Sequence, residues 1–129
     1  MDVQEVARNV TTMDKLCLST HDELHVLLLN HVLYIKADDH YCQVMYQNGT
    51  SIMLPYGLGY VEEQIKQREP HATLKRLGRT YIVNIARIIH IHTPRKQLVL
   101  IDSTGKRHTL QFTKELLREV MQLIAHENK

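Results

Sequence analysis

The 129 residues of the chain suffice for one domain with a modest core, and a content of 43% hydrophobic and 23% charged residues is ordinary for a globular protein. No apolar run approaches the roughly 18 residues that span a bilayer, and the N-terminus lacks the basic start and apolar core of a secretion signal, so we expect a cytoplasmic protein that does not enter the membrane. The net charge of +2 is unevenly distributed, because residues 1–65 hold three basic and nine acidic side chains whereas residues 66–118 hold twelve basic and three acidic ones.

Residues 1–65 predict a short helix followed by several strands. Val3, Val6 and Val10 follow the spacing of one helical face, so residues 1–10 are expected to form an amphipathic helix that covers the domain's own core or serves as an interaction surface. Apolar runs between turn-forming residues predict strands at residues 15–19, 24–30, 32–37, 40–47 and 51–54. Asn48 and Gly49 separate the last two, which favours a type I′ hairpin turn with φ > 0 at both central residues.

The second half of the chain predicts a central helix, more strands and a C-terminal helix. Leu58, Val61 and Ile65 lie on one face of an amphipathic helix of about three turns. Short β-favouring runs predict strands at residues 72–77, 80–83, 87–92, 97–102 and 107–112. An apolar stripe in residues 116–124 predicts a packed helix, with Thr113 as its N-cap.

Together these elements predict a mostly β protein with eight to ten short strands, a small central helix and a C-terminal helix. We find no internal repeat and no low-complexity segment in the sequence. The expected organisation is an N-terminal leader at residues 1–12, one domain at residues 13–126 and a short tail at residues 127–129.

The sequence contains no motif that points to catalysis or to a cofactor. Glycine-rich phosphate loops and the nucleophile elbow are both missing, so we expect neither an enzyme, nor a small-molecule substrate, nor a cofactor. His90 and His92 share one face of a strand, but a metal site usually requires three or four ligands, which favours surface or structural histidines. Cys17 and Cys42 lie far apart in sequence and are expected to be reduced and buried.

The most distinctive segment is residues 74–84, in which basic side chains interrupt an apolar run that ends in Tyr-Ile-Val-Asn. Lys75, Arg76 and Arg79 place three positive charges within five positions. Arginine can bind a guanine edge through two hydrogen bonds, and lysine or arginine neutralises phosphate. The alternative interpretation is a basic strand edge that protects the sheet from aggregation. The positive charge of residues 66–118 would favour a polyanionic partner if it gathered on one face.

Three blocks of the sequence resemble the LytTR family of bacterial DNA-binding domains, and the resemblance runs from about residue 15 to residue 124. Residues 32–41 resemble the family's apolar strand, acidic turn and aromatic residue. Residues 74–84 resemble its central signature, usually written F-x-R-x-H-R-S-Y-x-V-N, and residues 110–116 resemble its last strand-to-helix segment. The resemblance implies an elongated all-β stack of strands with small helices, whose loops enter successive major grooves and bend the duplex.

The resemblance also implies which residues contact DNA. The family's base-contacting positions match Tyr41, with His40 beside it, Arg79 and Lys114. Arg76 matches a second signature arginine, which we assign, with Lys75, to phosphate contact or to structural support. The expected DNA-binding residues are therefore His40, Tyr41, Lys75, Arg76, Arg79 and Lys114.

The chain departs from the family pattern at several of these positions. Gly78 stands where the signature has histidine, Leu74 where it has phenylalanine and Thr80 where it has serine. Thr113 and Lys114 replace the serine and arginine of the last block. Lysine is a point charge whereas arginine presents a planar fork, so the contact at Lys114 is expected to be less base-specific or to hold phosphate.

We expect a sequence-specific regulator of transcription that binds double-stranded DNA, at direct-repeat promoter sites and as a homodimer on the DNA. Family regulators often carry a receiver domain of roughly a hundred residues ahead of this one. Only about a dozen residues precede the match, which leaves a stand-alone member, favoured by Met1, or part of a longer chain. An alternative is a protein-interaction module that pairs with another regulator. A single-stranded nucleic-acid binder is a third hypothesis, but Tyr34 and Tyr81 are expected in the core.

Overall fold

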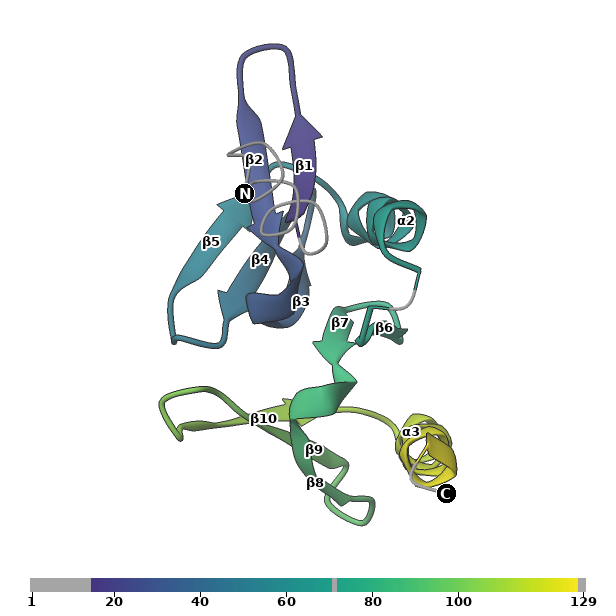
Figure 1. Ribbon diagram of the computed structural model, residues 1–129. Helices are drawn as coiled ribbons and strands as arrows, with labels where there is room; N and C mark the ends of the chain where they lie inside the picture. Colours follow the sequence, from purple (N-terminus) through teal and green to yellow (C-terminus); the bar gives the residue numbers. More distant parts are fainter. Residues whose placement is uncertain (1–14, 71, 128–129) are drawn as a thin grey trace, which may run out of the picture.

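The structure is a stack of three antiparallel sheets flanked by two α-helices (Figure 1). The computed structural model describes residues 15–70 and 72–127, and in this part of the chain the mostly β prediction is confirmed. The expected helix at residues 1–10 lies outside the described residues. In chain order the elements are β1 (Lys15–Ser19), β2 (Leu24–Leu28), η1 (Leu29–His31), β3 (Val32–Asp38), β4 (Tyr41–Tyr46), β5 (Ser51–Leu54), α2 (Leu58–Arg68), β6 (Leu74–Leu77), β7 (Tyr81–Asn84), η2 (Ile85–Arg87), β8 (Ile88–His92), β9 (Gln97–Ile101), β10 (Arg107–Gln111) and α3 (Lys114–Glu127).

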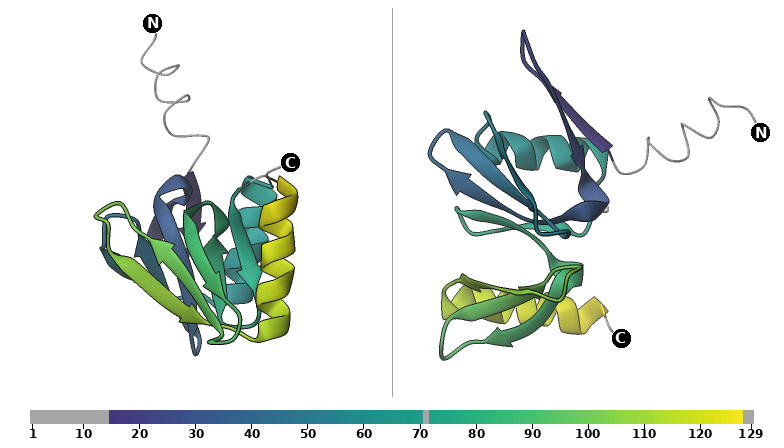
Figure 2. Two further views of the ribbon diagram at one scale, coloured as in Figure 1. Left: turned by 90° about the horizontal axis from the view of Figure 1, so that it is seen from below. Right: turned by 90° about the vertical axis from the view of Figure 1, so that its left-hand side faces the viewer.

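The three sheets follow one another along the stack. The hairpin β1–β2 forms the first sheet, the order β5-β4-β3-β7-β6 forms the second, and the order β10-β9-β8 forms the third. Both helices flank the stack on the same side, α2 beside the five-stranded sheet and α3 beside the three-stranded one (Figures 1 and 2). None of the helices in the described ranges is long and apolar enough to cross a membrane.

The five-stranded sheet separates two hydrophobic cores, and its central strands β3 and β7 contribute buried residues to both. Neighbouring residues of a strand point to opposite faces, so Ile82 joins the core shared with β1, β2 and α2, whereas Val83 joins the core shared with the three-stranded sheet and α3. In β3, Ile35 belongs to the first core and Leu33 to the second. This burial explains why residues 32–37 and 80–83 read as nearly continuous apolar runs.

The predicted central and C-terminal helices are confirmed. Leu58, Val61 and Ile65 of α2 are buried, as their spacing indicates. At the start of α3 the Leu116 amide donates a 3.2 Å hydrogen bond to the Thr113 hydroxyl, so Thr113 is the N-cap. The apolar stripe of α3 packs Leu117 and Val120 into the second core.

Two sequence-based predictions about local structure are wrong. The turn between β4 and β5 is not type I′. Of the two residues predicted to be central, Asn48 and Gly49, only Gly49 has a positive φ, which is 90°. Instead, the Asn48 side chain accepts hydrogen bonds from the Thr50 amide and hydroxyl, which favours a different turn. Cys17 is exposed rather than buried, because the alternation of β1 directs Leu16 and Leu18 inward; Cys42 is buried as predicted.

Asp102 is a buried carboxylate that holds together the turn between β9 and β10. One oxygen accepts hydrogen bonds from the Thr104 amide at 2.8 Å, the Thr104 hydroxyl at 2.6 Å and the Lys106 amide at 3.0 Å. The other lies 2.9 Å from Nε2 of His108. These contacts, led by the one with His108, hold the pKa of the Asp102 carboxyl well below its ordinary value of 3.8.

Asp102→Asn is expected to lower the melting temperature at pH 7 by about 5–10 °C, because an amide cannot accept all of these hydrogen bonds. The folded protein binds the carboxyl proton less readily than the unfolded chain does. The ionised group therefore favours folding above pH 3.8, and this contribution is lost as the pH falls from there through the lower pKa of the folded state. Thermal melts of both proteins between pH 7 and pH 3 should show the gap narrowing below about pH 4. A gap that stays constant over this range would contradict the assignment.

Candidate nucleic-acid interface

Four chain segments that are distant in sequence meet at one edge of the stack. They are the turn between β3 and β4, the turn between β6 and β7, the turn between β8 and β9, and the junction between β10 and α3, and we call them together the loop edge. The Ala37 amide donates a 2.7 Å hydrogen bond to the Thr80 carbonyl, which joins the end of β3 to the β6–β7 turn. The Phe112 amide donates a 3.0 Å hydrogen bond to the Lys96 carbonyl, which joins the β8–β9 turn to the β10–α3 junction.

A hollow of about 370 Å³ connects the two pairs of segments. Residues of the β6–β7 turn, one residue of the β8–β9 turn and the β10–α3 junction line it: Leu77, Gly78, Arg79, Thr80, Tyr81, Lys96, Gln111, Phe112, Thr113 and Leu116. Arg79 and Lys96 thus line the same hollow, at the point where α3 begins.

Arg79 is exposed at the tip of the β6–β7 turn. Its carbonyl accepts a 3.2 Å hydrogen bond from the Arg76 side chain. Among the described residues, no hydrogen bond or ion pair holds the Arg79 guanidinium, whose five donors are therefore available to a partner.

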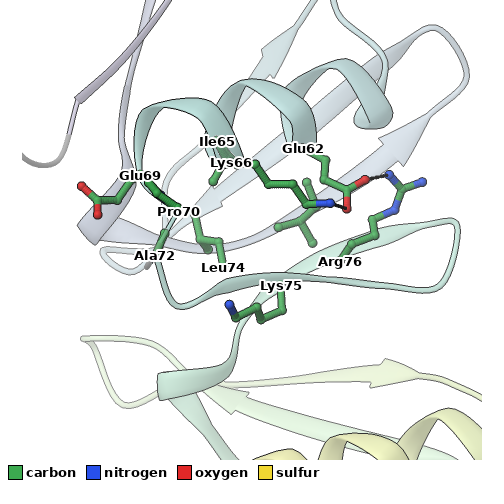
Figure 3. A pocket seen from close by; sticks show the side chains of 10 residues that line it. Glu62, Ile65, Lys66, Glu69, Pro70, Ala72, Leu74, Lys75 and Arg76 are labelled. Atoms are coloured by element: carbon green, nitrogen blue, oxygen red, sulfur yellow. Dashed lines mark hydrogen bonds and ion pairs between the residues drawn. The ribbon is translucent and has the colours of Figure 1, made fainter.

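Arg76, in contrast, is engaged with the protein itself. Its guanidinium donates to the Gly78 carbonyl at 2.9 Å, to the Arg79 carbonyl at 3.2 Å and to the Glu62 carboxylate at 2.8 Å. Lys66 lies 3.3 Å from the other Glu62 oxygen, so Glu62 bridges the two cations (Figure 3). These contacts brace the β6–β7 turn against α2, which favours structural support over phosphate contact for Arg76.

Lys75 lies apart from the hollow that contains Arg79. It lines a separate hollow of about 370 Å³ between α2 and β6, together with Glu62 and Arg76. In Figure 3 its side chain extends away from the Glu62–Arg76 pair. Of the two roles assigned to Lys75, phosphate contact would thus require a duplex that reaches beyond the loop edge.

His40 and Tyr41 lie at the β3–β4 turn and both are exposed, Tyr41 with 52% of its surface accessible. Asp39 precedes them with a φ of 57°, in the left-handed region, and its carboxylate lies 3.7 Å from Nε2 of His40. Asp38 pairs with Tyr41 across the hairpin. The turn therefore presents His40 and Tyr41 together.

Lys114 is the first residue of α3 and is exposed. It directly follows the N-cap Thr113, which lines the Arg79 hollow. The structure thus brings the predicted residues His40, Tyr41, Arg79 and Lys114 to one edge, and leaves Lys75 and Arg76 behind it on β6.

An aromatic cluster supports the loop edge from inside. The rings of Tyr34 and Tyr81 lie 5.9 Å apart, and those of Tyr81 and Phe112 lie 5.4 Å apart, both edge to face. Tyr34 and Tyr81 are half-buried and pack against the second core, as expected. Burial also raises the pKa of the Tyr34 hydroxyl. Rings held in this way are poorly placed to stack on the bases of a single strand.

Sequence reasoning missed Arg95 and Lys96, which are exposed on the β8–β9 turn. No motif marks them. The available signal was their place in the basic half of the chain next to Pro94, but the proximity of Lys96 to Arg79 depends on the stacking of two sheets. His90 and His92 do share a face, with ring centroids 5.9 Å apart. Among the described residues no group of three His, Cys, Asp or Glu could hold a metal ion.

Comparison with known proteins identifies the family of the chain. The family model described as the LytTr DNA-binding domain matches residues 22–125. The chain belongs to the LytTR family. A solved LytTr DNA-binding domain, from a Bacillus cereus protein described as a methyl-accepting/DNA response regulator, superposes with a TM-score of 0.56 at 20% identity, over 86% of this chain and 96% of that one. No curated protein matches the chain.

Membership of the LytTR family makes the protein a DNA-binding one and confirms the resemblance seen in the three sequence blocks. The solved LytTr domain shows a shared fold alone, since an identity of 20% carries no residue-level information. The residues that contact DNA in this chain therefore have to be inferred from its own geometry.

Gly78, where the chain departs from the LytTR signature, has a φ of 70°. A Cβ at this position would lie 3.6 Å from Cδ2 of Leu116, which is an ordinary contact. Space therefore permits a side chain, and the backbone conformation disfavours it. Glycine lets the turn carry Arg79 without strain.

Gly78→Ala is expected to lower the free energy of unfolding by about 1 kcal/mol, because alanine in the left-handed region loses roughly that much relative to glycine. Gly78→Asn should cost less, since asparagine tolerates this region. Urea unfolding of the wild type, Gly78→Ala and Gly78→Asn measures the order of their stabilities. Equal stability of the alanine variant and the wild type would show that the turn does not require glycine.

Proposed function

We propose that the protein is a transcription regulator that binds specific sequences of double-stranded DNA through its loop edge. The β3–β4 turn, the β6–β7 turn and the β10–α3 junction read successive major grooves, with Arg79 as the principal base-reading side chain. The observation that carries this proposal is the unengaged Arg79 guanidinium on a turn braced by Arg76. His40, Tyr41 and Lys114 provide further contacts, and the phosphates set register and supply affinity.

The protein acts at direct-repeat promoter sites in the cytoplasm, with two copies on the DNA, because one small module offers few base contacts. Membership of a family of DNA-binding domains supports a binding role rather than a catalytic one. Arg76 supports the turn, whereas Lys75 contacts a phosphate only if the duplex extends toward α2.

A salt titration tests the proposal on the wild-type protein. Binding to a random duplex should weaken steeply as the salt concentration rises, with log K falling by about 0.9 for each phosphate neutralised. A duplex with a selected site should bind more tightly at every salt concentration. An affinity for the duplex that does not change with the salt concentration would overturn the proposal.

One observation favours a second function, a protein-interaction module that pairs with another regulator. The outward face of the β1–β2 hairpin is apolar, with Leu24, Val26 and Leu28 exposed by 63%, 38% and 37%. Cys17 lies on the same face, opposite Val26. Burial of this face against another protein would remove apolar surface from water. A salt-independent response in the titration would support this alternative.

A further inference from the structure

Three hairpin turns of the protein share one closing hydrogen bond, and they differ in the residue that donates it. The amide of Gly49 donates to the Tyr46 carbonyl, that of Gly105 to the Asp102 carbonyl, and that of Lys96 to the Thr93 carbonyl. In each turn the donating residue is the fourth of the turn and has a positive φ, which is 90° for both glycines and 58° for Lys96. Two turns thus use glycine where the third uses lysine.

Lysine is an unfavourable choice for this backbone conformation. In the left-handed region the Cβ of an L-residue crowds the following carbonyl oxygen, which is why glycine or asparagine usually occupies such a position. A residue that is strained where its counterparts are not indicates that its side chain has a task. The β8–β9 turn would close more easily with a glycine in place of Lys96, as its two counterparts do.

The surroundings of Lys96 indicate what that task is. Its carbonyl accepts the Phe112 amide hydrogen bond, which fixes the turn beside the β10–α3 junction. Lys96 lines the same hollow as Arg79. Lys96 is exposed, and no ion pair within the described residues engages its ammonium group.

We propose that Lys96 neutralises a phosphate of the bound duplex and that the β8–β9 turn is a fourth DNA-contacting element of the loop edge. This inference rests on the proposed function, which assigns DNA contact to the other three segments. A lysine contributes a point charge rather than a planar fork, so Lys96 adds affinity for any sequence and leaves base preference to Arg79.

The test compares Lys96→Asn and Lys96→Gly with Lys96→Arg and with a matched control, Lys106→Asn. Lys106 is an exposed lysine of the β9–β10 turn, at the opposite end of β9. That turn lies beside the β4–β5 turn, where the Ser103 amide donates a 2.7 Å hydrogen bond to the Gln47 carbonyl (Figure 1). The control therefore makes the same charge change away from the loop edge.

Affinity for a random duplex and for a selected site is measured from 50 to 200 mM salt, together with the melting temperature of each variant. Lys96→Asn and Lys96→Gly should reduce the salt slope by about 0.9 and weaken both duplexes by a similar factor of roughly 3 to 10. Their melting temperatures should equal or exceed that of the wild type, because the left-handed strain is relieved. Lys96→Arg should keep the wild-type slope, and so should Lys106→Asn.

An unchanged slope in Lys96→Asn, while the wild type still binds DNA, would overturn this inference and leave the proposed function intact. Equal losses of DNA affinity in Lys96→Asn and Lys106→Asn would overturn this inference as well, because the affinity would then depend only on the net charge of the protein. A melting temperature lowered by Lys96→Gly would contradict the strain argument. Failure of the wild type to bind any duplex would overturn both proposals.

Discussion

Replacing Arg79 with alanine is expected to weaken binding to the cognate duplex by about 1–3 kcal/mol, a factor of roughly 5 to 150, and to relax base preference at one position. The guanidinium is exposed, and no described residue holds it by a hydrogen bond or an ion pair, so its loss should leave the fold intact. The turn itself remains braced, because Arg76 binds the Arg79 carbonyl rather than its side chain.

Two further variants separate base reading from charge. Arg79→Lys keeps the charge but loses the planar fork, so it should retain most of the affinity for random duplex and still lose base preference. Arg107→Ala removes an exposed arginine at the start of β10, at the other end of the three-stranded sheet, and should affect specific binding little. Titration of cognate, single-substituted and random duplexes measures all three. Unchanged affinity and preference in Arg79→Ala would remove Arg79 from the site.

Replacing Asn84 with alanine is expected to lower the free energy of unfolding by about 2–4 kcal/mol, because buried polar groups lose their partners. Asn84 is buried, with 4% of its surface exposed. Its amide donates to the Val32 carbonyl at 2.9 Å, and its carbonyl oxygen accepts from the Thr73 hydroxyl at 2.7 Å and the Ala86 amide at 3.1 Å. These bonds join β3, the approach to β6 and the 3-10 turn that leads from the second sheet to the third.

Urea unfolding measures the loss of stability in Asn84→Ala. Two further variants provide losses with which it can be compared. Thr73→Val removes one partner and should cost about 1 kcal/mol. Asn84→Asp retains an acceptor but cannot donate to the Val32 carbonyl, so it should destabilise strongly at neutral pH. Below its melting temperature Asn84→Ala should bind the cognate duplex as tightly as the wild type does, unlike Arg79→Ala, whose binding is weakened. A loss of less than about 0.5 kcal/mol would show that Asn84 does not hold the sheets together.

Local sequence patterns were sufficient for most elements of this fold. The stripe of α3 and the cap at Thr113 depend on spacing within one helix, which the sequence displays directly. The nearly continuous apolar run in β7 also reads correctly, since both faces of that strand are buried. These predictions succeeded because each depends on residues that are neighbours in the chain.

Predictions failed where a side chain or a distant element decided the outcome. The Asn48 side chain binds Thr50, so a pair typical of a type I′ turn formed another turn. Cys17 is exposed because its neighbours Leu16 and Leu18 take the inward face of β1, and thiol chemistry alone could not reveal this.

The sequence indicated several residues of the candidate site, but it did not indicate how they are arranged relative to one another. The signature pointed to Arg79, but the partner that separates Arg76 from it, Glu62, lies fourteen residues earlier in the chain on another element. Lys96 went unnoticed because its place in the Arg79 hollow arises only when the third sheet stacks beneath the second. Contacts between sheets leave no periodic trace in a sequence.

Selection of bound sequences from a pool of random duplexes, followed by footprinting of the best site, tests DNA recognition through the loop edge most directly. We expect enrichment of one sequence and protection of segments about 10 base pairs apart on one face of the duplex, because the loops enter successive major grooves. Repeating the selection with Arg79→Ala should relax the base preference at one position of the enriched sequence. A pool that shows no enrichment, or protection without this spacing, would contradict DNA recognition through the loop edge.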